Sequence, residues 1–275
     1  MTPNHASSIA VVRMLAWREL VRFFRQRHRV VGALGQPLIF WILFGAGLSR
    51  SFRMGEAGDG PSFSEYYFPG TLMLTLLFTA IFATISIIED RREGFLQGVL
   101  VAPVARWSIV AGKVGGGVAI ALIHGVVYLA FGLTLHLNKN IGDWLQLAGL
   151  LVISAWAMTC LGFVIAWRLD STQGFHAVMN LLLMPMWLLS GAFFPLPSLL
   201  GGESLGQVAL HWLMRLNPLT YCVAGVRRLW GAAELPTGFY QPSLATAWIV
   251  ASVFALAMQA LAVAVTAKRS KGDWQ

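Results

Sequence analysis

Few ionisable groups in this chain could do chemistry, and one of them, Lys113, follows a glycine in Ala111-Gly112-Lys113-Val114. A Gly-Lys pair occurs in the phosphate-binding loop of ATPases, where the lysine reaches the phosphates. That loop also needs a serine or threonine directly after the lysine and an earlier glycine, and this stretch has neither. The sequence therefore predicts that this chain does not hydrolyse ATP itself.

Three histidines lie in apolar stretches of the chain, and an intramembrane histidine can relay protons. His124 lies near the middle of an apolar stretch and His136 near its end, while His176 lies at the start of another. A buried histidine more often hydrogen-bonds a neighbouring helix, so a proton relay is a minor alternative. The sequence has no metal-ligand spacing of His, Cys, Asp and Glu and no order that suggests a Ser-His-Asp set. We expect no cofactor, no metal site and no enzymatic activity.

The composition is that of a membrane protein. Of the 275 residues, 57% are hydrophobic and 12% charged, whereas soluble domains have about 25% charged residues. The net charge of +8 could attract nucleic acid, but the basic residues form no patch interleaved with aromatic side chains. Nucleic acid is therefore not an expected partner, and membrane lipid is.

Six apolar stretches reach the roughly 20 residues that a helix needs to cross a bilayer. They are Val30–Ser49, Tyr66–Ile88, Trp107–Leu137, Trp144–Trp167, Gly174–Phe194 and Ser243–Thr266. The predicted fold is all-α, a polytopic membrane protein with six transmembrane helices. No Asp or Glu lies well inside any of these stretches. Lys113 is the one charged residue that lies inside a stretch, and its side chain is expected to extend to the headgroups.

The basic residues predict the orientation. If the stretches alternate across the membrane, fourteen of the 20 lysines and arginines fall on the side of the two termini. Since Lys and Arg gather on the cytoplasmic side, both termini are predicted to be cytoplasmic. The expected location is the plasma (inner) membrane.

Residues 1–29 are predicted to form an amphipathic helix in the cytoplasmic interface, ahead of the six-span domain of residues 30–267. Trp17, Leu20, Val21 and Phe24 share one helical face. Arginines on a neighbouring face are expected to point toward anionic headgroups. They are Arg18, Arg22, Arg25 and Arg29.

The segment before the last span, residues 195–242, is predicted to be an outer helical hairpin. Leu205–Leu216 and Tyr221–Trp230 are apolar and too short to span, and the turn signal Asn217-Pro218 separates them. A short cytoplasmic tail, residues 268–275, is expected at the end of the chain.

The cytoplasmic loop of residues 89–107 combines charges with a short apolar helix. Five charged residues run from Glu89 to Glu93, and the apolar side chains after them stop at Pro103. Phe95, Leu96, Val99 and Leu100 form one face of that helix. The pattern indicates a docking surface for another protein, with an ordinary solvated loop as the alternative.

This loop, with its mixed charges, glycine, spaced leucines, proline and arginine, resembles the coupling loop of the type-2 ATP-binding-cassette exporter permeases. Leu189–Pro195 resembles that family's end of the fifth span, and Asn217–Tyr221 with Gly225–Arg228 resembles its outer signature. Gln36-Pro37 in the first span also fits. The resemblance covers nearly the whole chain in matching order. One departure is Arg92-Glu93-Gly94-Phe95, where many members have an acid before a base and a Gly-Thr pair.

The resemblance implies two six-span permeases, a homodimer or a pair of close paralogues, with two ATPase subunits docked from the cytoplasm. The implied ATPase-coupling residues are Glu89, Arg91, Arg92, Glu93, Gly94, Leu96, Leu100, Pro103 and Arg106. The implied outer gate comprises Phe193, Phe194, Pro195, Asn217 and Pro218.

A substrate path would run along the second and fifth spans, with lipid contact or helix packing as the alternative for each residue. Its residues would be Thr75, Phe78, Thr79, Phe82, Asn180, Met184 and Trp187. Methionine adapts to varied apolar ligands, so the expected cargo is hydrophobic, drug-like or lipid-linked, and its export is driven by a separate ATPase. The rivals are a non-transport membrane assembly subunit and an ion-coupled secondary carrier.

Overall fold

The computed structural model describes residues 8–48, 63–132, 140–199, 201–202, 204–231 and 239–267. Within them the chain is all-α, and its one isolated β-bridge pairs Pro197 with Phe239. The helices are α1 (Ser8–Arg25), α2 (Arg27–Leu48), α3 (Phe63–Ala83), α4 (Ile85–Arg92), α5 (Phe95–Val101), α6 (Arg106–Gly132), α7 (Ile141–Arg168), α8 (Thr172–Leu188), α9 (Leu205–Leu216), α10 (Pro218–Trp230) and α11 (Leu244–Ala267). The predicted fold class is confirmed.

Five helical segments of the described chain are long and apolar enough to cross a membrane: α2, α3 with α4, α6, α7 and α11. The expected fifth span, Gly174–Phe194, is helical only as the 17-residue α8. Helix α8 ends at Leu188, before Gly191 takes the left-handed conformation with φ 75°. A helix of that length is at the lower end of the roughly 17–25 residues that cross a bilayer. The fifth span is therefore shorter than predicted.

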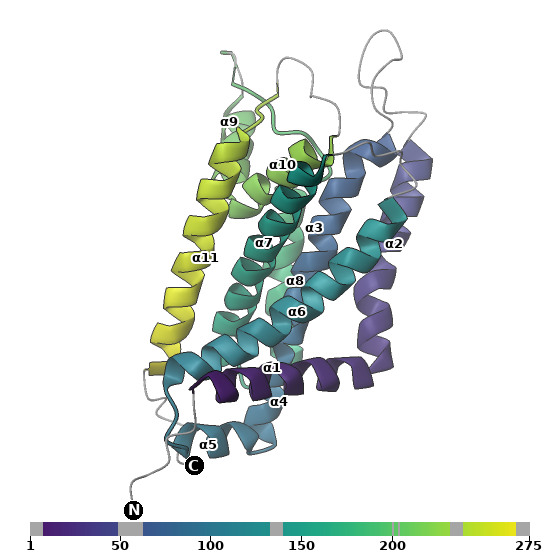
Figure 1. Cartoon of the computed structure of the whole chain (residues 1–275). Helices are drawn as coiled ribbons and strands as arrows, with labels where there is room; N and C mark the ends of the chain where they lie inside the picture. Colours follow the sequence, from purple (N-terminus) through teal and green to yellow (C-terminus); the bar gives the residue numbers. More distant parts are fainter. Residues whose placement is uncertain are drawn as a thin grey trace, which may run out of the picture.

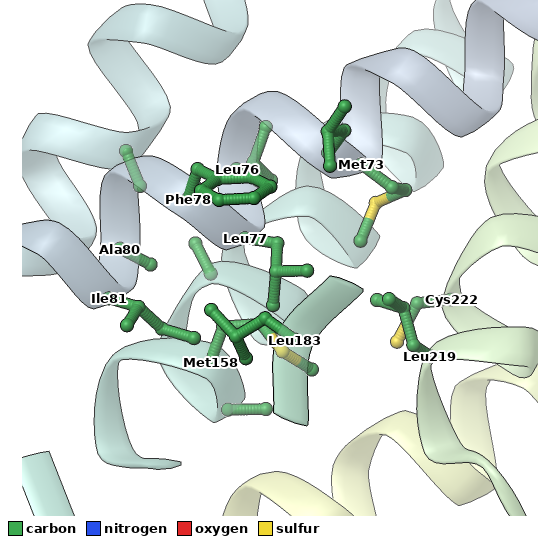
Figure 2. Packing of buried hydrophobic residues seen from close by; sticks show 14 of the residues in the cluster. Met73, Leu76, Leu77, Phe78, Ala80, Ile81, Met158, Leu183, Leu219 and Cys222 are labelled. Carbon is green, nitrogen blue, oxygen red and sulfur yellow. The ribbon is translucent and has the colours of Figure 1, made fainter. Parts of the chain in front are cut away.

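Helix α3 forms the centre of the bundle. Its sequence is apolar on all sides, which is typical of a helix surrounded by others, and 94% of an 18-residue apolar window within Phe63–Arg92 is buried. Figure 2 shows α3 side chains such as Met73 and Leu77 near residues of other helices. The neighbours include Met158 of α7, Leu183 of α8 and Leu219 of α10.

The two ends of the bundle differ (Figure 1). Helix α1 lies across one end, near α4 and α5, and the last turns of α11 reach the same end. Helices α9 and α10 lie at the opposite end and meet at Asn217, where the sequence predicts two short helices. Helix α10 begins earlier than predicted, at Pro218, because Asn217 caps it and Pro218 takes its first position.

Some expectations fall outside the described residues. They are the tail, residues 268–275, the end of the third apolar stretch, residues 133–137, and Ser49.

Candidate functional site

Helix α1 packs against the first half of α6, where two glycines one turn apart permit a close approach. A Cβ at Gly112 would lie 2.7 Å from Leu15 Cβ, and a Cβ at Gly116 would lie 2.6 Å from Glu19 Cβ. Small residues four apart let helix backbones come together in this way. A Cβ at Gly115 would meet nothing within 4 Å, so the close packing belongs to one face of α6.

A lysine on that face joins α1 to α4 through two buried carboxylates. Lys113 Nζ lies 2.6 Å from Glu19 Oε1 and also contacts Asp90 Oδ2. Arg18 binds Asp90 with both guanidinium amines, at 2.6 and 2.9 Å, and Arg22 contacts the same carboxylate. Bidentate arginine–carboxylate pairs fix geometry as well as charge. Asp90 is fully buried and Glu19 is 4% exposed, so the tie lies inside the protein.

Two more carboxylates of this end extend the tie to α2. Glu89 contacts Arg29, at the start of α2, and lies 3.1 Å from Arg22. Glu93 lies 2.9 Å from Arg22. Together, four cations and four carboxylates form what we call the ion-pair cluster. Its members are Arg18, Arg22, Arg29, Lys113, Glu19, Glu89, Asp90 and Glu93.

The ion-pair cluster corrects two expectations. Lys113 does not extend to the headgroups, since its side chain is 3% exposed. Its partner Asp90 lies only two residues past the predicted second span, and in the structure the helical segment runs on through it to Arg92. The apolar bundle therefore does contain buried carboxylates at this end. An unpaired charge there would be costly, and pairing is what makes burial tolerable.

Helix α1 packs against the bundle with one face and leaves another face exposed. Its buried residues are Val11, Leu15, Glu19 and Phe23. Trp17, from the predicted apolar face, is 67% exposed, and Phe24 is 39% exposed. The arginines next to them bind carboxylates of α4 rather than pointing only outward. Helix α1 is thus buried against the bundle on one side and presents apolar side chains such as Trp17 on the other side.

Helix α5 is the predicted short helix of the loop, and it packs against α1. Gly94 begins it in the left-handed conformation, with φ 77°, which glycine adopts without the penalty of a Cβ. Arg18 Cζ lies 3.7 Å from the centroid of the Phe95 ring, a cation–π contact. Leu96 is 2% exposed and lies in the bundle core. Four further apolar side chains pack against a small buried cluster of Val11, Leu15 and Ile109. They are Phe95, Val99, Leu100 and Val104.

The remaining loop residues join α4 to the end of α7. Arg91 donates to the carbonyl of Trp167 at 2.6 Å and to the Asp170 carboxylate at 2.9 Å. Arg92 donates to the Asp170 carbonyl at 3.2 Å. Pro103 follows α5, and Arg106 is the first residue of α6. Most predicted coupling residues are therefore engaged within the chain itself.

An exposed surface remains around the ion-pair cluster. The Glu93 side chain is 58% exposed, and Val101, at the end of α5, is 75% exposed. An open groove of about 560 Å³ lies between α1 and Glu93. Its lining residues are Trp17, Arg18, Val21, Arg22, Arg25, Gln26 and Glu93. This end thus combines an exposed surface with the buried charges of Lys113, Glu19 and Asp90, which hold α6, α1 and α4 together.

The sequence profile of the family described as "ABC-2 type transporter" matches residues 10–229, from α1 through α10. The chain belongs to this family. It is thus a membrane transport protein rather than an enzyme, and the matched region contains the ion-pair cluster.

Three individual relatives of this chain share 26–28% of its residues over the aligned regions. The chain is 28% identical over 215 residues to "Inner membrane transport permease YadH" of Escherichia coli K12, covering 76% of this chain and 78% of that protein. It is 26% identical over 223 residues to "Putative transport permease ycf38" of Cyanophora paradoxa, covering 79% and 73%. It is 26% identical over 222 residues to "Nodulation protein J" of Rhizobium leguminosarum bv. viciae, covering 78% and 77%. Two of these three relatives are named as transport permeases.

At the other end of this ABC-2 chain, the expected gate residues lie around the end of α8. Asn217 accepts from Leu219 N at 3.0 Å and donates to the Met186 carbonyl at 2.5 Å, so the α9–α10 turn is fixed to α8. Phe193 packs edge-on against Tyr67 and Phe194, with ring centroids 5.4 and 4.7 Å apart. Pro195 follows them, and Pro218 begins α10. Both groups thus lie near the end of α8, where Asn217 contacts Met186 and Phe193 contacts Tyr67.

The expected path residues do not share one surface. Thr75, Phe78 and Thr79 of α3 are buried inside the chain's own bundle. Trp187 of α8 is 1% exposed, and its indole donates to the Gly70 carbonyl at 2.8 Å. Asn180 is exposed. Phe82 and Met184 are partly buried against the core.

The sequence interpretation missed the pairing of Glu19 with Lys113. Glu19 is the one acidic residue of its helix, and Lys113 is the one charged residue well inside its apolar stretch. Isolated opposite charges in apolar surroundings are candidates for a buried ion pair. The glycines beside Lys113 were a second signal, because they mark where a neighbouring helix can approach.

Proposed function

We propose that this chain is the membrane-spanning permease subunit of an ATP-driven exporter in the inner (plasma) membrane. In this proposal an ATP-binding-cassette ATPase, encoded as a separate chain, docks at the end that carries α1 and α5. The observation that carries the proposal is the buried tie of Lys113 to Glu19 and Asp90. It makes α1, α4 and α6 one mechanical unit next to an exposed loop helix.

The tie matters because coupling requires motion at one surface to reach the spans. A partner that pushes α5 moves Phe95, which contacts Arg18, and Arg18 is fixed to Asp90. Asp90 lies in the segment that continues from α3, the central helix. Buried, hydrogen-bonded ion pairs transmit displacement because breaking them leaves an uncompensated charge.

We propose that a second permease copy, identical or paralogous, completes the transport path. Asn180 is exposed on α8 beside Leu181, which is 81% exposed. An exposed amide on an apolar span face is more stable against another helix or a water-filled path than against lipid. The buried threonines of α3 are not part of this open surface, so the α8 face is the better candidate for contact with a hydrophobic or lipid-linked cargo.

The ion-coupled carrier is less well supported by the same geometry. Glu19 and Asp90 each have a lysine or arginine partner, which favours a structural tie over an ion-transport site. His124 packs against the rings of Phe23 and Phe24, with centroid distances of 5.4 and 5.9 Å, and its Nδ1 lies 2.9 Å from the Ile120 carbonyl. That environment matches a packed histidine.

The test is co-purification of the candidate ATPase with variants of exposed apolar residues at the two ends. We expect Val101→Asp on α5 to weaken co-purification several-fold, because it places a charge on the proposed docking surface. Leu205→Asp on α9 is the matched control, since Leu205 is 89% exposed at the opposite end. Equal recovery of the ATPase with both variants would reject the docking site. Cargo accumulation in liposomes driven by a pH gradient alone, without the ATPase, would support the carrier instead.

A further inference from the structure

A cavity of about 140 Å³ lies at the end of the bundle opposite α1. Its lining residues come from the segment after α8, from α10 and from the segment before α11, and Figure 1 shows α10 and the start of α11 at that end. The residues that matter for its chemistry are Ser190, Gly191, Thr220, Arg227, Arg228 and Tyr240. Two guanidinium groups line it, and none of its lining residues in the described part of the chain carries a carboxylate.

Arg227 is a buried cation without a carboxylate partner in the described part of the chain. It is 6% exposed, and the described ion pairs all involve other residues. Its Nη2 donates to the Gly191 carbonyl at 2.8 Å, and its Cζ lies 4.1 Å from the Tyr66 ring centroid. Its Nε is buried and has no acceptor among the described residues.

Those contacts account for only part of what a buried guanidinium needs. The group has five N–H donors, and a buried charge is normally paired with an opposite charge. Burial lowers the pKa of Arg227, and a neighbouring anion would oppose that shift. A purely structural role, in which Arg227 joins Gly191 to α10, would explain the hydrogen bond from Nη2 to the Gly191 carbonyl. It would not explain why the buried Nε has no acceptor among the described residues.

Arg228 adds a second positive charge to the same cavity. Its Nε donates to the Pro242 carbonyl at 2.8 Å, and its Nη2 lies 3.4 Å from the Gln241 carbonyl. These bonds hold the side chain along the cavity wall. The hydroxyls of Ser190 and Thr220 are already committed as donors to the carbonyls of Trp187 and Met214, so the arginines dominate the chemistry of the cavity.

We propose that this cavity binds a phosphoryl group at the outer end of the protein. Two guanidinium groups match the charge of a phosphate better than that of a single carboxylate, and guanidinium geometry suits phosphate oxygens. The volume is too small for a drug-sized ligand, whose pockets are roughly 300–1,000 Å³. It suits a headgroup or a free phosphate.

The position of the cavity fits a headgroup. Pro242 lines it, and the spanning helix α11 begins two residues later at Leu244. The end of a spanning helix marks the boundary between hydrocarbon and headgroups. The phosphoryl group therefore comes either from a lipid or from a soluble phosphate, and the inference does not depend on the ATPase proposed above.

The test uses the purified full-length chain with two probes. Native mass spectrometry counts the phosphatidylglycerol molecules that each chain retains, and thermal unfolding of the delipidated protein measures stabilisation by pyrophosphate. We expect Arg228→Gln to weaken the binding of one probe at least about tenfold, the effect of losing a charge-assisted hydrogen bond. Arg227→Gln should do the same where it folds. Because Arg228 is exposed, its variant keeps the test decisive if Arg227→Gln does not fold.

Arg168→Gln is the matched control. It removes one positive charge from the exposed last residue of α7, which does not line the cavity. Loss of lipid in the cavity variants alone identifies a lipid headgroup, and loss of pyrophosphate stabilisation alone identifies a soluble phosphate. The inference is overturned if the wild-type chain binds neither probe. It is equally overturned if the Arg228 variant binds like wild type or if Arg168→Gln loses as much binding.

Discussion

The ammonium group of Lys113 lies 2.6 Å from the Glu19 carboxylate, 94 residues away in the sequence. Lys113 also contacts Asp90, so one side chain of α6 joins α1 to α4. The pair lies where α6 has glycines facing α1, which gives the two helices the short separation that the pair requires. The Lys113–Glu19 ion pair and the close packing of α1 on α6 thus depend on each other at the proposed coupling end.

Replacing Lys113 by methionine should destabilise the protein by roughly 3–5 kcal/mol, because it leaves a buried carboxylate uncompensated. Glu19 would keep only the Arg18 contact at 3.4 Å. The free energy of unfolding in a denaturant titration measures the loss. Adding Glu19→Gln to Lys113→Met should recover part of it, since the double variant removes both charges. Arg25→Gln, at an exposed position of α1, should have little effect; no recovery in the double variant would contradict a direct pair.

Two neighbouring glycines of α6 should respond in opposite directions to alanine. At Gly116 the new Cβ would lie 2.6 Å from Glu19 Cβ, so α1 must shift, and overpacking typically costs about 1–3 kcal/mol. At Gly115 it would meet nothing within 4 Å, so Gly115→Ala should stabilise the helix by up to about 1 kcal/mol. Melting temperatures of the two variants in the same detergent decide the matter. Equal shifts would mean that α1 does not pack on this face.

The sequence predicts the spans well because a run of apolar residues is a local signal. It fails at the end of the fifth span, where Phe193 and Phe194 are apolar but follow Gly191, whose positive φ lies beyond the end of the helix. It does not show which face of α1 packs against the bundle, because Trp17 and Leu15 are both apolar and only the neighbouring helix decides which is buried. The ion-pair cluster joins residues from distant parts of the chain, such as Arg18 and Asp90, 72 apart. No local pattern specifies such a pairing.

Gly94→Ala should disturb α5 through backbone strain alone. Gly94 has φ 77° and an added Cβ would meet nothing within 4 Å, so the cost is the roughly 1–2 kcal/mol of a left-handed alanine. We expect faster hydrogen exchange in residues 95–101 and weaker coupling to the ATPase. Gly98→Ala, inside α5 with an ordinary φ and open space, should leave exchange unchanged or slower. Identical exchange in both variants would show that the Gly94 turn does not position α5.

Cys222, in the core beside Leu219, should be inert to thiol reagents in the folded protein. Burial raises the pKa of its thiol to about 11, and the reactive species is the thiolate. Because the raised pKa keeps the thiol protonated below about pH 11, increasing the pH from 7 to 9 should not start maleimide labelling. Cys160 is also buried, so mass spectrometry should detect no adduct until detergent denaturation exposes both cysteines. A Leu205→Cys variant, at a position 89% exposed, should label at once and shows that the reagent is active. Labelling of Cys222 in the native protein would mean that α10 separates from the bundle core.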